Sequence, residues 1–283
     1  MTEILPDLLE KLDEFAPHRD PIPPDVCRVL GTFVRAWHDA LPDHDHNTIY
    51  KPPLIRLFGA LVGSRDEVLP ARDRNTLIKP LLPRLVGTQG SARLTERRAM
   101  MAADWLVRVH TPAWLRLAKL IVHAEALEGL PEITSMEQVP SIQGLIELSR
   151  RAAEAAWLAA KTAAWDDLPG GFWSDIEVAL DGPSAYVGGL KAVRTNSAWI
   201  ARWRAAVDAA RSTAGEAARD ATWGVNRNVS WHPAWIAAWA ACYDAAQAAA
   251  LADLKPTQER LQDSARDLLV RMIEATEPTE TRP

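Results

Sequence analysis

The amino-acid sequence predicts an all-α protein, in which short N-terminal helical repeats, stacked as an irregular solenoid, continue into a bundle of long Ala/Trp-rich helices. Three observations predict this fold class. A proline-led segment recurs with a period of about 28 residues in the first half of the chain, long alanine-rich stretches follow, and most of the twelve tryptophans lie within those stretches. Alanine-rich stretches bring helix backbones close together, and the large indole rings fill the gaps between them.

The repeat is clearest between residues 41–59 and 69–87, which share eleven of nineteen residues. Their common pattern is a proline, an arginine four residues later and then an aliphatic residue, and it also occurs around Arg28 and Arg116. Proline is favoured in the first turn of a helix, and an arginine four residues on lies on the same face. We therefore expect short helices that begin at these prolines and stack, because none can bury its apolar face alone.

The arginines of this repeat allow two interpretations. They are Arg28, Arg56, Arg84 and Arg116. In the structural interpretation each clamps a neighbouring carboxylate or helix end. In the functional interpretation they form a row that faces an acidic partner. The five donors of a guanidinium group, fixed in a planar fork, suit either role.

Cap and proline signals place the helices in the rest of the chain. We expect Thr95 and Thr111 to cap two successive helices, with Pro112 at the first helical position of the second. Lys255 and Pro256 are expected to break the chain before a last amphipathic helix. Three long helices are predicted before that break, over residues of about 141–165, 196–222 and 233–253.

These elements predict three regions along the chain. Residues 1–135 form the helical repeat region, and residues 136–275 form the Ala/Trp-rich helical bundle. A short connection bracketed by Pro131 and Pro140 marks the boundary between them. Residues 276–283 have the polar, charged composition of a disordered tail.

Aromatic residues recur at every fourth position near the end of the bundle, at Trp231, Trp235, Trp239 and Tyr243. On a helix this spacing gives a slowly drifting ridge of rings. Because the positions between them are mostly alanine, we predict that Trp235 and Trp239 are core residues. The alternative is that these rings line a groove for a ligand or a peptide.

Two loops between the long helices have a composition suited to binding. Residues 168–189 are rich in glycine, and residues 222–233 gather several polar side chains in one turn between helices. Binding residues are common on loops that a rigid scaffold positions, although most such loops only cap helices. The second loop supplies five candidate ligand-binding or partner-binding residues: Asn226, Arg227, Asn228, Trp231 and His232.

The motifs of common enzyme classes are absent from the sequence. It contains no phosphate-binding GxxxxGKS/T or GxGxxG, no GxSxG nucleophile elbow and no HExxH. The run Asp43–His46 resembles a metal-binding segment, but the equivalent repeat positions keep only an aspartate, Asp73. We therefore predict no catalytic residue, no metal site and no cofactor. A catalytic site assembled from distant segments stays open.

The charge balance and the cysteines limit the partners and the compartment. The formal net charge of −5 is spread over both halves, whereas nucleic-acid binding needs concentrated lysine and arginine. The first residues lack the pattern of a signal peptide, and no apolar run is long enough to span a membrane. Cys27 and Cys242 lie in apolar helical patterns and are expected to be buried free thiols. These features predict a cytoplasmic protein that does not bind nucleic acid.

Beyond residue 95 the chain contains the blocks ERRAMMAADWLVRVHTPAWLRLA and AEALEGLPEI, and then Ala/Trp-rich helices that end in LKPTQERLQDSARDLLVRMI. These blocks resemble a group of uncharacterised Ala-rich helical proteins from actinobacteria, over roughly residues 65–275. The resemblance implies the helical fold and brings no activity and no site residues. The composition of helices such as Ala217–Ala221 is also similar to that of Ala-rich immunity proteins.

Together these expectations favour a non-catalytic binding or scaffold protein that acts through protein–protein contacts, in an immunity-like or regulatory role. A protein partner is predicted, and a homo-oligomer stays open. The alternative is an enzyme or small-molecule-binding protein whose site lies among the Ala/Trp-rich helices and the loops 168–189 and 222–233. A pocket lined by tryptophan and buried polar groups favours the alternative, whereas a smooth core with an exposed apolar strip favours the scaffold.

Overall fold

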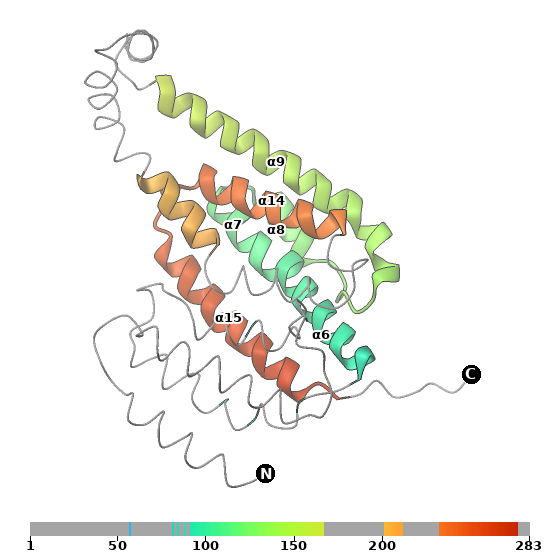
Figure 1. Cartoon of the computed structure of the whole chain (residues 1–283). Coiled ribbons are helices and arrows are strands. Elements are labelled where there is room, and N and C mark those ends of the chain that lie inside the picture. The colour runs from blue at the N-terminus through green and yellow to red at the C-terminus, as the bar shows by residue number, and fades with distance from the viewer. Residues whose placement is uncertain are drawn as a thin grey trace, which may run out of the picture.

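A computed structural model of the chain describes residues 91–166, 201–211 and 232–276, with the single residues Leu57, Leu81, Arg84 and Thr88. These segments are helical and contain no strand, so the all-α prediction is confirmed for the described part (Figure 1). The elements are α6 (Ala92–Trp105), η2 (Leu106–His110), α7 (Thr111–Leu117), α8 (Ile121–Glu128), η3 (Met136–Gln138), α9 (Val139–Asp166), α14 (Pro233–Ala248) and α15 (Lys255–Glu274). A further helix covers residues 201–210.

The helix α6 begins earlier than the sequence predicts. Its N-cap is Ser91, whose Oγ accepts a hydrogen bond from the Leu94 N–H at 3.2 Å. The predicted cap, Thr95, lies inside the first turn and donates its hydroxyl to the Ser91 carbonyl oxygen at 3.0 Å. The prediction of a cap at Thr95 was therefore wrong, because a serine four residues upstream already satisfies the first N–H groups.

The helix α7 begins at Thr111 with Pro112 in its first turn, as predicted, but Thr111 does not cap it and no break precedes it. The helices α6 and α7 form one run through η2, a π-helical turn in which the Thr111 N–H reaches the Leu106 carbonyl five residues back. Pro112 has no N–H to donate to an α-helical ladder, and an interrupted ladder at this point accommodates its ring. The Thr111 side chain does not cap a helix but donates to the Ala238 carbonyl oxygen of α14 at 3.2 Å.

The long helices lie close to their predicted positions. The helix α9 confirms the segment predicted at 141–165, and α14 begins as predicted but ends at Ala248. The segment predicted at 196–222 is described only over residues 201–211. Lys255 and Pro256 form the first turn of α15 instead of preceding the helix, because proline is tolerated where no N–H partner is needed.

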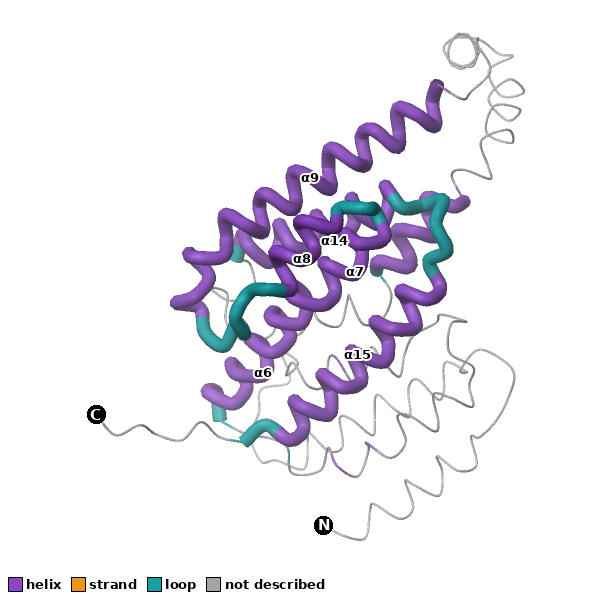
Figure 2. Tube along the Cα trace, turned by 180° about the vertical axis from the view of Figure 1, so that it is seen from behind, coloured by secondary structure: helices purple, strands orange, loops and turns teal. Residues whose placement is uncertain are grey.

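The helix α14 lies at the centre of the described structure. It packs most extensively against α9 on one side and against α7 on the other, while α15 packs against α6 and α7. Figures 1 and 2 show α9 along the outer edge and α15 on the opposite side of α14. Buried residues of all these helices form one cluster, to which Trp235 and Trp239 belong with exposed fractions of 3% and 9%. The prediction that both are core residues is confirmed.

Two of the four repeat arginines are described, and both contact carboxylates. Arg84 pairs with Glu274 at 2.6 Å, and Arg116 donates from Nε to Glu128 at 2.9 Å. These contacts agree with the structural interpretation of the repeat. The other two arginines lie outside the described residues, as do the repeat segments 41–59 and 69–87 apart from Leu57, Leu81 and Arg84.

Two other expectations concern regions that the structure describes only in part. Cys242 is a buried free thiol as predicted, while Cys27 lies outside the described ranges. The predicted tail is described only at Thr276. No helix in the described part of the chain is both long and apolar enough to cross a membrane.

Candidate functional site

Of the five predicted binding residues, the structure places only His232. Its Nδ1 accepts a hydrogen bond from the Ala234 N–H at 3.3 Å, so the imidazole caps α14. Its ring lies 6.0 Å from the ring of Trp235, and partial burial lowers the pKa of His232. The other predicted binding residues, Asn226, Arg227, Asn228 and Trp231, lie outside the described ranges.

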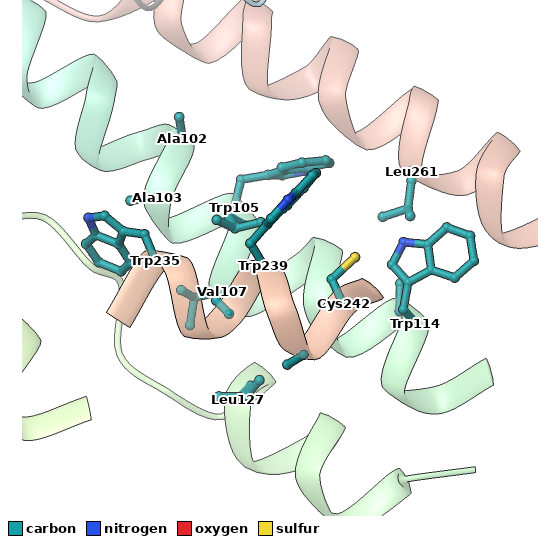
Figure 3. Close-up of a cluster of buried hydrophobic side chains, with 14 of the residues drawn as sticks. Ala102, Ala103, Trp105, Val107, Trp114, Leu127, Trp235, Trp239, Cys242 and Leu261 are labelled. Carbon is teal, nitrogen blue, oxygen red and sulfur yellow. The ribbon is translucent and has the colours of Figure 1, made fainter. Parts of the chain in front are cut away.

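The described core contains a buried imidazole–thiol pair. His110, at the end of η2, places its Nδ1 at 3.4 Å from the Sγ of Cys242 on α14. Three indole rings surround the imidazole: Trp239 stacks on it at 5.8 Å, Trp105 lies tilted at 5.1 Å, and Trp114 meets it edge-on at 6.4 Å. Figure 3 shows Trp239 and Cys242 on the same helix, with Trp105 and Trp114 on the facing run. His110 and Cys242 are both fully buried.

The hydrogen bonds of this pair fix its protonation. The Trp114 Nε1–H donates to His110 Nε2 at 3.4 Å, and because an indole N–H can only donate, Nε2 carries no proton. Burial lowers the pKa of His110 to about 3, so the neutral ring carries its proton on Nδ1 and donates to the sulfur. Burial, with the nearby charge of Asp244, raises the pKa of the Cys242 thiol. The pair is therefore a neutral thiol beside a neutral imidazole, without the thiolate that nucleophilic catalysis requires.

No sequence motif singles out His110. The available signal is local: a histidine in an apolar run, with tryptophan five residues before it and four residues after it. On a helix the residue four positions on lies on the same face, which places Trp114 near the imidazole. The contact with Cys242 joins positions 132 residues apart and has no sequence signal.

A second aromatic cluster joins α9, the helix at 201–210 and the end of α14. The rings of Trp157 and Trp203 stack at 4.9 Å, and the Trp203 Nε1–H donates to Gln247 at 2.7 Å. Arg211 donates to the Tyr243 hydroxyl at 2.8 Å and lies over its ring. These polar groups bind one another, so the cluster holds the helix at 201–210 against α14.

The outward face of α9 carries two exposed leucines that contact no other described helix. Leu148 and Leu158 are half-exposed, at 54% and 53%, although leucine is usually buried. A Cβ atom added to Gly144 would meet nothing within 4 Å. Figures 1 and 2 both show no other coloured element on this side of α9. The small uncharged residues that share this face are Gly144, Ala152, Ala155, Ala159 and Thr162.

Metal ligands do not cluster in the part of the chain that the structure covers. No group of three or more His, Cys, Asp or Glu side chains is arranged to hold an ion there. The run Asp43–His46 lies outside that part.

No protein-family model, curated protein or solved structure matches this chain. The function must therefore follow from its own packing, charges and exposed surfaces.

Proposed function

We propose that this protein is a non-catalytic helical scaffold that acts through protein–protein contacts and that the outward face of α9 is its binding surface. The observation that carries the proposal is the pair of half-exposed leucines, Leu148 and Leu158, on a helix face lined with alanine. A regulatory or immunity-like role fits such a surface, because both roles act by occupying a partner protein.

The chemistry of the face favours an apolar helix as the contacting element. Helix-in-groove recognition uses apolar anchors spaced by three or four residues, as Leu148, Ala152, Ala155 and Ala159 are. The acidic and basic side chains of the face pair with one another, as Arg151 does with Glu147 at 3.2 Å. Recognition by packing should therefore depend little on ionic strength.

The buried imidazole–thiol pair supports a non-catalytic function. Cys242 and His110 bring a nucleophile and a base within 3.4 Å of each other in the described core, and burial keeps both uncharged by raising the pKa of the thiol and lowering the pKa of the imidazole. Their three indole neighbours fill the space around them. The pair therefore serves the packing of α14 against η2.

In this proposal, residues 1–135 form a stack of short helical repeats that belongs to the same scaffold and adds to its surface. Eleven identities in nineteen positions support the repeat, and so do the carboxylate contacts of Arg84 and Arg116.

Co-purification from the native host tests the proposal. A tagged chain should capture a protein partner that a Leu148→Glu/Leu158→Glu variant no longer captures, because a carboxylate would be buried without a partner in the contact. The matched control is Val122→Glu/Leu251→Glu, which alters two more exposed apolar residues away from α9. Equal capture by the wild type and the α9 variant would contradict the proposal.

A small-molecule-binding function is favoured by one separate observation. The Trp235 Nε1–H is buried without a hydrogen-bond partner, beside His232 at the predicted binding loop. A ligand with a carbonyl or anionic oxygen would satisfy this donor. A thermal-shift screen of such compounds tests the alternative: binding that disappears in Trp235→Phe, which keeps an aromatic ring but removes the N–H, would support it.

A further inference from the structure

The outward face of α9 has an internal two-fold pattern. Leu148 and Leu158 lie five residues on either side of position 153, and Gly144 and Thr162 lie nine residues on either side. At 3.6 residues per turn, positions eighteen residues apart point in the same direction, so Gly144 and Thr162 lie on one line along the helix. Leu148 and Leu158 are ten residues apart and point about 40° to opposite sides of that line.

This pattern matches itself when a second α9 is laid against it in the antiparallel direction. A two-fold axis that passes between the two helices, level with position 153, places each Leu148 against Leu158 of the second copy. The same axis places each Gly144 against Thr162 of the second copy. Because no atom lies within 4 Å of a Cβ added at Gly144, the face is open where that threonine would pack. A symmetric interface of this kind is self-complementary, as closed dimers require.

We propose that the occupant of the α9 face is a second copy of this chain, packed antiparallel about position 153. The inference rests on the proposed function, in which this face binds a protein. The opposed leucines and the glycine–threonine contacts would bury the apolar groups that the single chain leaves exposed.

The charges agree with the antiparallel arrangement. Glu147, Arg151 and Glu154 lie along one flank of the face, and alanines, including Ala152 and Ala159, lie along the other. The two-fold axis lays the charged flank of each copy along the charged flank of the other, and Arg151 of one copy then lies level with position 155 of the other, next to Glu154, so that opposite charges meet. In a parallel pairing in register, the two Arg151 side chains would lie opposite each other near the centre, which is unfavourable.

Among the described helices, α9 lies where a second copy can approach it. Both views show α9 on the outside, with α14, α7 and α15 on its inner side (Figures 1 and 2). The stretch from Gly144 to Thr162 is about 27 Å long, at 1.5 Å per residue, which provides five helical turns of contact.

Sedimentation equilibrium of the untagged full chain tests the dimer. The wild type should have twice the chain mass of 31.2 kDa, and Leu148→Glu/Leu158→Glu should raise the dimer Kd at least tenfold, since it places carboxylates at the central apolar contacts. Circular dichroism verifies that the variant is folded, and Val122→Glu/Leu251→Glu is the control that should remain dimeric. A monomeric wild type, or a dimer that the α9 variant does not weaken, would overturn the inference.

Cysteine cross-linking tests the register. In a Cys27→Ser background, Gly144→Cys together with Thr162→Cys should form a cross-linked dimer with a short bismaleimide, because the two positions meet across the axis. Each single variant should remain uncross-linked, since its two copies lie far apart along the helices. Cross-linking of either single variant would indicate a parallel pairing and refute the register, as would the absence of cross-linking in the double variant.

The two proposals fail in different ways. A chain that is monomeric in sedimentation, yet loses a host partner when Leu148 and Leu158 are changed, would retain the scaffold function and refute the second copy as the occupant. If the chain forms the antiparallel dimer but captures no host protein, the second copy as occupant of the α9 face is supported and the scaffold function with a host protein partner is refuted.

Discussion

At the scale of single residues, Trp239 connects the buried imidazole to the second aromatic cluster. Its ring stacks on His110 at 5.8 Å and meets Tyr243 edge-on at 4.8 Å. We expect Trp239→Ala to lower the free energy of unfolding by about 3–5 kcal/mol, from lost apolar transfer and the cavity left behind. Chemical denaturation measures this loss. Ile236→Ala, on the exposed side of the same helix, should cost less than about 1 kcal/mol. An equally small loss for Trp239→Ala would contradict its core role.

His110 should make the stability of the protein depend on pH. Its pKa is about 3 in the folded chain and 6.5 in an unfolded reference, so between these values only the unfolded chain binds the proton. The contribution of the neutral His110 to the free energy of unfolding is therefore complete above pH 6.5 and is lost as the pH falls toward 3. In that range the free energy of unfolding should fall by an amount approaching ~1.4 kcal/mol per pH unit.

Denaturation of the wild type and of His110→Gln between pH 6.5 and 5 measures this contribution. The pKa of Glu147 is lowered to about 2, so this carboxylate does not titrate in that window, and His232 is common to both proteins. The variant should be less stable than the wild type at neutral pH, but its free energy of unfolding should change less with pH. Identical slopes would show that His110 is not the titrating group.

At the scale of elements, the π-helical turn η2 sets the rotation of α7 relative to α6. It contains one residue more than an α-helical turn, so deleting Val109 would turn α7 by about 100° and remove Trp114 from the core. We expect the deletion to cost more than about 4 kcal/mol, whereas Val109→Ala, at a partly exposed site, should cost less than about 1 kcal/mol. Urea denaturation with near-ultraviolet circular dichroism compares the two. Similar stabilities would mean that the turn has no role in packing.

Two adjacent arginines of α6 bind the C-terminal end of α15 in different surroundings. Arg98 is buried and donates to the carbonyl oxygens of Met272 at 2.8 Å and Thr88 at 2.6 Å. Arg97 is exposed and donates to the Thr276 carbonyl oxygen at 3.1 Å.

We predict that Arg98→Ala lowers the free energy of unfolding by about 2–4 kcal/mol, because one buried and one partly buried carbonyl group lose a charged donor. Arg97→Ala should cost less than about 1 kcal/mol, because water can replace its hydrogen bond. Thermal and chemical denaturation of both variants give the difference. Equal losses would mean that burial does not strengthen the Arg98 contacts.

At the scale of the whole molecule, we expect folding without a metal ion. The described residues contain no cluster of metal ligands, and their core is held by apolar contacts and by hydrogen bonds among buried polar groups. Exhaustive chelation should leave the melting temperature within about 1 °C of a sample dialysed without chelator, since a structural metal contributes directly to folding free energy. A large decrease would direct attention to Asp43–His46.

The sequence by itself determined the helical class, the position of α9 and the burial of Trp235 and Trp239. These features depend on patterns within a few turns, since alanine-rich periodicity and four-residue spacing act between near neighbours along the chain. It located helix ends less well. Ser91, and not Thr95, is the N-cap of α6, and η2 joins α6 to α7 without a break before Thr111. The reason is that neighbouring residues compete for the same backbone groups.

Only the tertiary structure decided which helix faces meet. The pairing of His110 with Cys242, the hydrogen bond from Trp203 to Gln247 and the clamp of Arg98 on α15 join residues far apart in the sequence. The outward position of Leu148 and Leu158 is likewise a tertiary result. An amphipathic pattern shows which residues can be buried, but the helices that pack against α9 determine which of its apolar residues stay exposed.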